Sequence, residues 1–134
     1  MEIIHGTDIL SKGKIKLTLR YSVQRQTLVV TVHHIEDLHF DDTKSVYVKI
    51  YILPERHKET KRKTKIVKTS KNPVFDETFE YAIPQDEFDS KQLEVLVVEE
   101  RLVGHHPIEK VLIDLDKLGL VLPYTRLFRL SKTH

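Results

Sequence analysis

Hydrophobic and polar positions alternate along most of the chain. Residues 14–20 read KIKLTLR, which places Ile15, Leu17 and Leu19 on one side of an extended strand. The same period of two recurs in seven further segments: 27–34, 46–53, 62–68, 77–83, 92–99, 110–115 and 126–130. Turn-like sequences such as SKNP and LVGHHP separate them, and no segment has a sustained helical period. The pattern predicts an all-β, eight-stranded antiparallel β-sandwich.

Length and composition indicate a single domain with its own core. The chain has 134 residues, of which 40% are hydrophobic, and it contains no cysteine. Disulfides and thiolate metal sites are therefore excluded. We expect an N-terminal extension or linker over residues 1–12, the domain over 13–131 and a tail over 132–134. No apolar run approaches the roughly 20 residues needed to cross a bilayer, so we expect any membrane contact to be peripheral.

Charge is distributed unevenly along the sequence. The net charge is only +2, but between Glu55 and Lys71 the basic residues exceed the acidic ones by six, which leaves −4 on the rest of the chain. The centre of this basic segment reads KETKRKTKIV, residues 58–67. A basic segment on an acidic body predicts an anionic partner.

One long stretch resembles the C2 domain family. Residues 45–81 read SVYVKIYILPERHKETKRKTKIVKTSKNPVFDETFEY, in which fixed residue types of that family recur in register. The matching positions are Tyr47, Val48, Lys49, Leu53, Pro54, Lys63, Thr64, Asn72, Pro73, Phe75, Glu77 and Phe79. The resemblance extends over about residues 13–131 and implies the C2 β-sandwich (a Greek key) with synaptotagmin-type topology.

Within that family, three segments look most like the C-terminal C2 domain of extended synaptotagmins: YILPER, NPVFDETFEYAIP and EKVLIDLDKLGL. C2 domains of class II phosphoinositide 3-kinases are the next most similar. The first likeness implies a lipid-binding, membrane-tethering module linked to lipid transport. It implies a location on the cytosolic side of membranes, at the plasma membrane or its contact sites with the endoplasmic reticulum. The second implies the C2 domain of a lipid kinase or trafficking protein.

The resemblance also addresses calcium. Calcium-binding C2 domains use about five aspartates in two loops, because this hard cation needs several charged oxygen ligands. Here Ser45 stands at a ligand position of the first loop, where only Asp41 and Asp42 remain. In the second loop, Glu99 stands at the first ligand position and Arg101 at the second. A guanidinium among would-be ligands opposes a divalent cation. We therefore expect a calcium-independent domain without a metal or other cofactor, with the two aspartates as turn formers.

The basic segment becomes more specific when it is read as a strand. Residues two apart share a face, so Lys61, Lys63 and Lys65 point one way, and Thr64 and Ile66 point toward the core. Alternation in 46–53 turns Tyr47, Lys49 and Tyr51 outward. If the two strands pair across the short PERHKET connection, these outward side chains merge into one surface.

Several C2 domains hold a phosphoinositide headgroup with a tyrosine, a lysine two residues along and two lysines of the next strand. Tyr47, Lys49, Lys61 and Lys63 match those positions. The predicted phosphoinositide-binding residues, which would contact phosphatidylinositol bisphosphate, are Tyr47, Lys49, Lys61, Arg62, Lys63 and Lys65. The tyrosine would supply a flat wall and a hydroxyl donor. Roughly 1 kcal/mol per basic residue near an anionic leaflet predicts reversible, salt-sensitive docking.

Other interpretations stay open at this point. A lysine-rich strand also protects a sheet edge from aggregation, and the basic face could instead dock an acidic protein segment. Nucleic acid is disfavoured because aromatic residues are few and no recognition motif is present. No catalytic motif points to an enzyme, and we expect the isolated domain to be monomeric.

Two loop features remain. Phe40, Leu102 and Val103 would lie at one end of a C2 sandwich, where they either insert into a membrane or pack locally under the loops. The pairs His33-His34 and His105-His106 invite a metal interpretation. We disfavour it because adjacent residues of a strand face opposite sides, and because we expect the second pair to lie in a loop without a nearby carboxylate partner.

Overall fold

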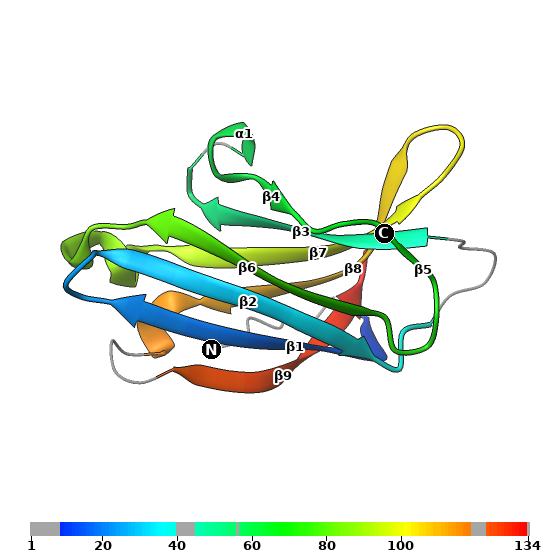
Figure 1. Ribbon diagram of the computed structural model, residues 1–134, viewed down its shortest axis with the longest axis horizontal. Helices are drawn as coiled ribbons and strands as arrows, with labels where there is room; N and C mark the ends of the chain where they lie inside the picture. Colours follow the sequence, from blue (N-terminus) through cyan, green and yellow to red (C-terminus); the bar gives the residue numbers. More distant parts are fainter. Residues whose placement is uncertain (1–8, 40–44, 56, 119–122, 134) are drawn as a thin grey trace.

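The computed structural model describes residues 9–39, 45–55, 57–118 and 123–133 (Figure 1). Within these ranges the strands are β1 (Leu10–Ser22), β2 (Thr27–Glu36), β3 (Ser45–Leu53), β4 (Arg62–Lys63), β5 (Val67–Lys68), β6 (Val74–Ala82), β7 (Gln92–Glu100), β8 (His105–Asp114) and β9 (Tyr124–Lys132). Helical turns are short: α1 (His57–Thr60), η1 (Gln85–Ser90) and η2 (Leu115–Lys117). All described strand pairs are antiparallel.

The strands form two layers that meet along one seam. Their hydrogen-bonded order is β4-β3-β7-β8-β9-β1-β2-β6, with β5 also paired to β3. Only Glu109↔Lys132 and Lys110↔Ser131 join β8 to β9, so the path folds over at this point. We call β4, β5, β3, β7 and β8 the first layer, and β9, β1, β2 and β6 the second layer. In Figure 1, β2 and β6 of the second layer pass in front of β7 and β8.

The core lies between the layers and follows the predicted alternation. Along β1, Ile15, Leu17 and Leu19 are buried while the residues between them are at least partly exposed. The largest fully buried side chains include Phe75, Phe88 and Phe128, from β6, η1 and β9. The predicted antiparallel β-sandwich is confirmed.

The basic segment differs from the single strand expected over 62–68. The Thr64 N–H donates to the Val48 carbonyl, and the Thr64 hydroxyl accepts from the Val48 N–H at 2.9 Å. The Lys65 N–H then turns to the Glu77 carboxylate of β6 instead of β3. The strand is thus divided into β4 and β5. The inward placement expected for Ile66 was wrong, because this side chain is 46% exposed at the break.

The ends of the domain are held by the second layer. β1 begins at Leu10, so its first residues fall within the segment expected to be an extension, and β9 runs to Lys132. The Lys132 N–H donates to the Ile9 carbonyl at 2.7 Å.

Candidate functional site

Lysines from three strands of the first layer form one row. Lys49 of β3 lies opposite Lys63 of β4, and cross-strand partners share a face of the sheet. On the other side of Lys49, Leu96 of β7 is its partner, and Leu96 is in turn opposite Lys110 of β8. Val48 and Ile50 flank Lys49 and are fully buried, so the row faces away from the core. We call Lys63, Lys49 and Lys110 the lysine row.

The lysine row is compact and electrostatically unfavourable in isolation. Neighbouring strands lie about 4.8 Å apart, so four strands bring its ammonium groups within about 15 Å. Like charges directly opposite each other destabilise a sheet. The Lys49–Lys63 pair is therefore not explained by stability and is a candidate for recognising an anion.

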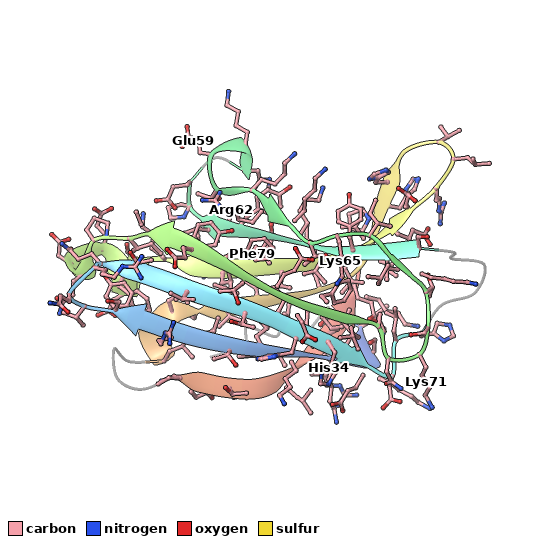
Figure 2. All side chains as sticks on the ribbon, viewed as in Figure 1. His34, Glu59, Arg62, Lys65, Lys71 and Phe79 are labelled. Atoms are coloured by element: carbon pink, nitrogen blue, oxygen red, sulfur yellow. The ribbon has the colours of Figure 1, made fainter. Side chains whose placement is uncertain are left out.

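Lys61 and Lys65 extend the positive charge beside the row. Both side chains are exposed, and Lys61 directly precedes β4. The strand pairing of this segment reaches Lys63 but not Lys65, which lies in the break before β5 (Figure 2). The structure therefore places Lys49 and Lys63 on one face by register and leaves Lys61 and Lys65 as exposed neighbours.

Arg62 does not share the face of the lysine row. It lies opposite Ile50, whose side chain is in the core, and alternation turns it toward the second layer. Its guanidinium carbon lies 4.6 Å above the centre of the Tyr81 ring, and Nη2 donates to the Glu80 carbonyl at 3.4 Å. Arg62 therefore lies on the other side of β4 from Lys63, held by its cation–π contact with Tyr81. Its expected contact with a phosphoinositide stays a prediction.

Tyr47 and Tyr51 alternate with core residues as expected, yet neither is an open wall. Tyr47 is 3% exposed and Tyr51 is 6% exposed. The Tyr51 ring lies 4.2 Å from the ring of His57, and the Tyr47 hydroxyl lies 2.8 Å from Nδ1 of His105. The hydroxyl expected as a free donor is thus already bonded.

Burial also raises the pKa of both Tyr47 and Tyr51, with smaller contributions from neighbouring groups. Both rings therefore stay neutral at physiological pH. Tyr47 lies on the same face of β3 as Lys49 and is joined to the β7–β8 hairpin through His105.

That hairpin presents two apolar side chains at its tip. Leu102 is fully exposed and Val103 is 86% exposed. Gly104, with φ +77°, accommodates the turn, and its carbonyl accepts from the Arg101 N–H at 3.2 Å. The hairpin projects clearly from the body of the sandwich (Figure 1, yellow). Local packing under the loop, the second interpretation from the sequence, therefore does not apply to these two residues. Phe40 lies outside the described residues.

The sequence profile of the C2 domain family matches residues 26–130. The chain belongs to the C2 domain family. Among solved structures, the C2 domain resembles the third C2 domain of KIAA1228 protein, with a TM-score of 0.81, 31% identity and coverage of 97% of this chain and 95% of that one. A C2 domain of RIM from Drosophila gives a TM-score of 0.80 at 27% identity, covering 91% of this chain and 98% of that one.

Curated relatives of the C2 domain include extended synaptotagmins, as the sequence resemblance indicated. Extended synaptotagmin-3 of Homo sapiens is 34% identical over an alignment of 135 positions that covers 96% of this chain. The chain spans 15% of the length of that relative, so the comparison describes one domain of a much longer protein.

An ion pair occupies the loop position at which the family resemblance aligned calcium ligands. The Glu99 carboxylate, 4% exposed, contacts the guanidinium of Arg101. Ser45 begins β3 at the other former ligand position, whereas Asp41 and Asp42 lie outside the described residues. Within the part of the chain that the structure describes, no group of three or more histidine, aspartate or glutamate side chains could hold a metal ion.

Two expectations about the histidines were wrong. His105 and His106 lie opposite Glu100 and Glu99 across the β7–β8 hairpin, so carboxylates do neighbour them. The pair His33-His34 does not face opposite sides, since a β-bulge shifts the register around it. His34 is the partner of outward Lys16, and His33 reaches the Thr18 hydroxyl at 2.7 Å.

None of the helices in the described parts of the C2 domain is long and apolar enough to span a membrane.

Proposed function

We propose that this C2 domain binds phosphoinositide headgroups on an anionic membrane surface, without calcium, through the lysine row and the adjacent Lys61 and Lys65. The observation that carries the proposal is the cross-strand pair Lys49–Lys63 with Lys110 in the same row. A bisphosphorylated inositol presents two compact anionic groups, and the row offers ammonium groups at comparable spacing on a rigid sheet. Its phosphates would remove the repulsion between the paired lysines.

Electrostatic attraction accounts for reversible rather than permanent binding. Each basic residue near an anionic leaflet contributes about 1 kcal/mol. Five lysines would thus contribute at most about 5 kcal/mol, which corresponds to sub-millimolar affinity. A second contact is needed for tighter binding.

The hairpin tip supplies that second contact. Leu102 and Val103 are almost fully exposed, and burying one such side chain is worth about 1.5–3 kcal/mol. Because β7 and β8 carry both the tip and part of the lysine row, insertion of the tip would bring the row near the same leaflet. Together the two contacts would reach micromolar affinity.

The ion pair between Glu99 and Arg101 supports calcium-independent binding. Arg101 already neutralises Glu99, so a divalent cation would have to displace a bonded guanidinium. We therefore expect membrane binding that does not change when calcium is chelated.

The likeness to extended synaptotagmins extends the proposal to the parent protein. We propose that the domain grips the plasma membrane on its cytosolic side as part of a protein that tethers the endoplasmic reticulum to it. In this role the domain binds lipid and carries out no reaction.

The test is co-sedimentation of the domain with phosphatidylcholine vesicles, with or without phosphatidylinositol bisphosphate and calcium. The variant Lys49→Gln/Lys63→Gln removes two charges but keeps the aliphatic stems. We expect about 30-fold weaker binding to the phosphoinositide vesicles. The variant Lys58→Gln/Lys71→Gln has the same change in net charge at exposed positions outside the row, and we expect less than about a threefold effect.

Equal weakening by both variants would show that only net charge matters and would reject the lysine row as a site. Binding to an acidic peptide but to none of the vesicles would instead identify a protein-interaction domain. A requirement for calcium would overturn the proposed role of Arg101.

A further inference from the structure

A second basic surface lies on the opposite side of the sandwich. The outward positions of β1 read Lys12, Lys14, Lys16, Thr18 and Arg20, between inward residues of the same strand. Arg129 of β9 is the cross-strand partner of Lys14. We call Lys12, Lys14, Lys16, Arg20 and Arg129 the basic stripe.

Acidic residues are few in the described strands that carry and flank the basic stripe. Glu36, opposite Lys14, is the sole acidic residue in the described strands β1, β2 and β9. Its carboxylate lies 2.8 Å from Nε2 of His34. Arg129 keeps its position by donating from Nε to the Ser11 carbonyl at 3.1 Å. Over these three described strands, the five basic residues of the stripe and Glu36 sum to +4, and Lys14 and Arg129 are a pair of like charges directly opposite each other.

The shape of the stripe differs from that of a headgroup site. Its residues follow one strand, where each residue rises about 3.3 Å, so Lys12 and Arg20 are separated by about 27 Å. The outward residue between Lys16 and Arg20 is Thr18, whose hydroxyl lies 2.8 Å from that of Thr125. A long line of cations on an open sheet is suited to a flat, extended anionic surface rather than to one compact anion.

The stripe and the lysine row face in opposite directions because they lie on the outer faces of two packed layers. From this geometry we propose that the basic stripe binds a second anionic bilayer while the lysine row holds the first, so that one domain joins two membranes. This inference rests on the proposed function for the lysine row. Sheets pack about 10 Å apart, and one layer of side chains on each side brings the separation of the two bilayers to roughly 20 Å.

A bilayer fits the stripe better than a peptide or a nucleic acid. An extended peptide that adds to the second layer would pair with the open edge of β9 or of β6, so it would lie beside β1 in the plane of the sheet and not over the outward face that carries the stripe. Single-stranded nucleic acid would require aromatic platforms for its bases, and the outward residues of β1 contain none. A leaflet rich in phosphatidylserine requires only spread positive charge.

The experiment uses two vesicle populations with different dyes. One contains phosphatidylinositol bisphosphate in phosphatidylcholine, and the other contains phosphatidylserine in phosphatidylcholine. The unmodified domain should bind each population in co-sedimentation and should cluster the two together, measured by light scattering and by co-localisation of the dyes. The variant Lys14→Gln/Lys16→Gln should bind phosphatidylserine vesicles about 30-fold more weakly and should abolish clustering. Its binding to phosphoinositide vesicles should change less than about twofold.

The lysine-row variant Lys49→Gln/Lys63→Gln should give the reverse pattern, and Lys58→Gln/Lys71→Gln serves as the charge-matched control. If the unmodified domain binds vesicles but never clusters them, the second site is rejected and the proposed function stands. Clustering that survives in the stripe variant would also reject it, because self-association would then join the vesicles. If the domain binds phosphatidylserine vesicles through the stripe but does not bind phosphoinositide vesicles, the proposed function of the lysine row is rejected and the stripe remains a membrane-binding surface.

Discussion

The two outer faces of the sandwich carry similar positive charge, but their basic residues are arranged in different directions relative to the strands. On the first layer, the lysine row crosses four strands within about 15 Å. On the second layer, the basic stripe follows β1 for about 27 Å. Charges arranged across strands are gathered into a cluster that can surround one small anion. Charges arranged along a strand are spread into a line that can only recognise a surface. We infer that the direction of a basic pattern on a sheet, together with its charge, selects the shape of anion that it fits.

The largest effect is expected from a core substitution, because unfolding removes the binding activity of both faces. Phe128 is fully buried between the layers, where Arg126 lies 5.1 Å above its ring. Replacing it by alanine leaves a cavity and should lower the free energy of unfolding by about 3–5 kcal/mol, measured by urea denaturation. Both binding activities should then be lost at the same denaturant concentration. Leu127→Ala, at a half-buried outward position, should cost much less. Equal costs would contradict the core position of Phe128.

Changing the hairpin tip should weaken binding at the first face and not at the second, without changing the stability of the domain. The variant Leu102→Ser/Val103→Ser removes apolar side chains that touch little of the protein. It should weaken phosphoinositide vesicle binding by about 3–6 kcal/mol, measured by co-sedimentation. The thermal unfolding midpoint should be unchanged, and binding to phosphatidylserine vesicles through the stripe should be much less affected.

Val23→Ser is the control for the tip variant, because Val23 is an exposed apolar residue in the turn between β1 and β2. It should not weaken binding to either vesicle. If the tip variant binds phosphoinositide vesicles normally, the tip does not contribute to this binding and the lysines alone account for it.

A smaller effect on stability is expected from a change to Tyr47, which is buried on the first layer. Tyr47→Phe removes the hydrogen bond between the phenol and Nδ1 of His105. The free energy of unfolding should fall by about 0.5–1.5 kcal/mol, and the basic stripe should be unaffected. Because the hydroxyl is already bonded within the protein, phosphoinositide affinity should fall less than with Lys49→Gln/Lys63→Gln. If it falls further, the hydroxyl contacts the headgroup directly, as the sequence first suggested.

The smallest effect concerns the pH dependence of the seam between the layers. Glu109 lies opposite Lys132 there, and burial raises the pKa of its carboxyl above the ordinary value of 4.5, opposed by the Ser11 hydrogen bond and by nearby His39 and Lys132. A raised pKa means that the folded state holds the proton more tightly than the unfolded state. Its contribution to stability is therefore present below pH 4.5 and is lost as the pH rises through the raised value.

Glu109→Gln cannot ionise, so its stability relative to the unmodified domain should be greater at pH 7.5 than at pH 4. Denaturation curves at both pH values measure this difference. An equal or opposite difference at the two pH values would contradict the raised pKa.

Sequence reasoning was most successful where the evidence was local. The period of two located seven of the eight predicted strands, because one buried face per strand is encoded directly in neighbouring residues, whereas the strand expected over 62–68 is divided into β4 and β5. It also turned Lys49 outward, and the family resemblance aligned Lys63 with it. Whether these residues bind phosphoinositide remains a prediction.

Long-range contacts account for what was missed. Lys110 joins the row through Leu96, and nothing near Lys49 in the sequence indicates that register. His105 bonds the Tyr47 hydroxyl from the far end of the second loop, so the covered ring could not be foreseen. A β-bulge placed both His33 and His34 outward, against strict alternation. The lysines and arginine of β1 alternate visibly in the sequence, but only the layer arrangement shows that they face away from the lysine row.

Arg62 holds one side of the short strand β4 against Tyr81, and so affects which side of the strand its other side chains occupy. This strand pairs with β3 through only two residues, Lys49↔Lys63 and Ile50↔Arg62, while the guanidinium is held over Tyr81. A single-residue deletion in the preceding turn would move every following side chain to the other side of the strand. The arginine would then face the solvent and a lysine would point between the layers. The cation–π contact of Arg62 would thus help to keep the neighbouring lysines on the outward side of β4.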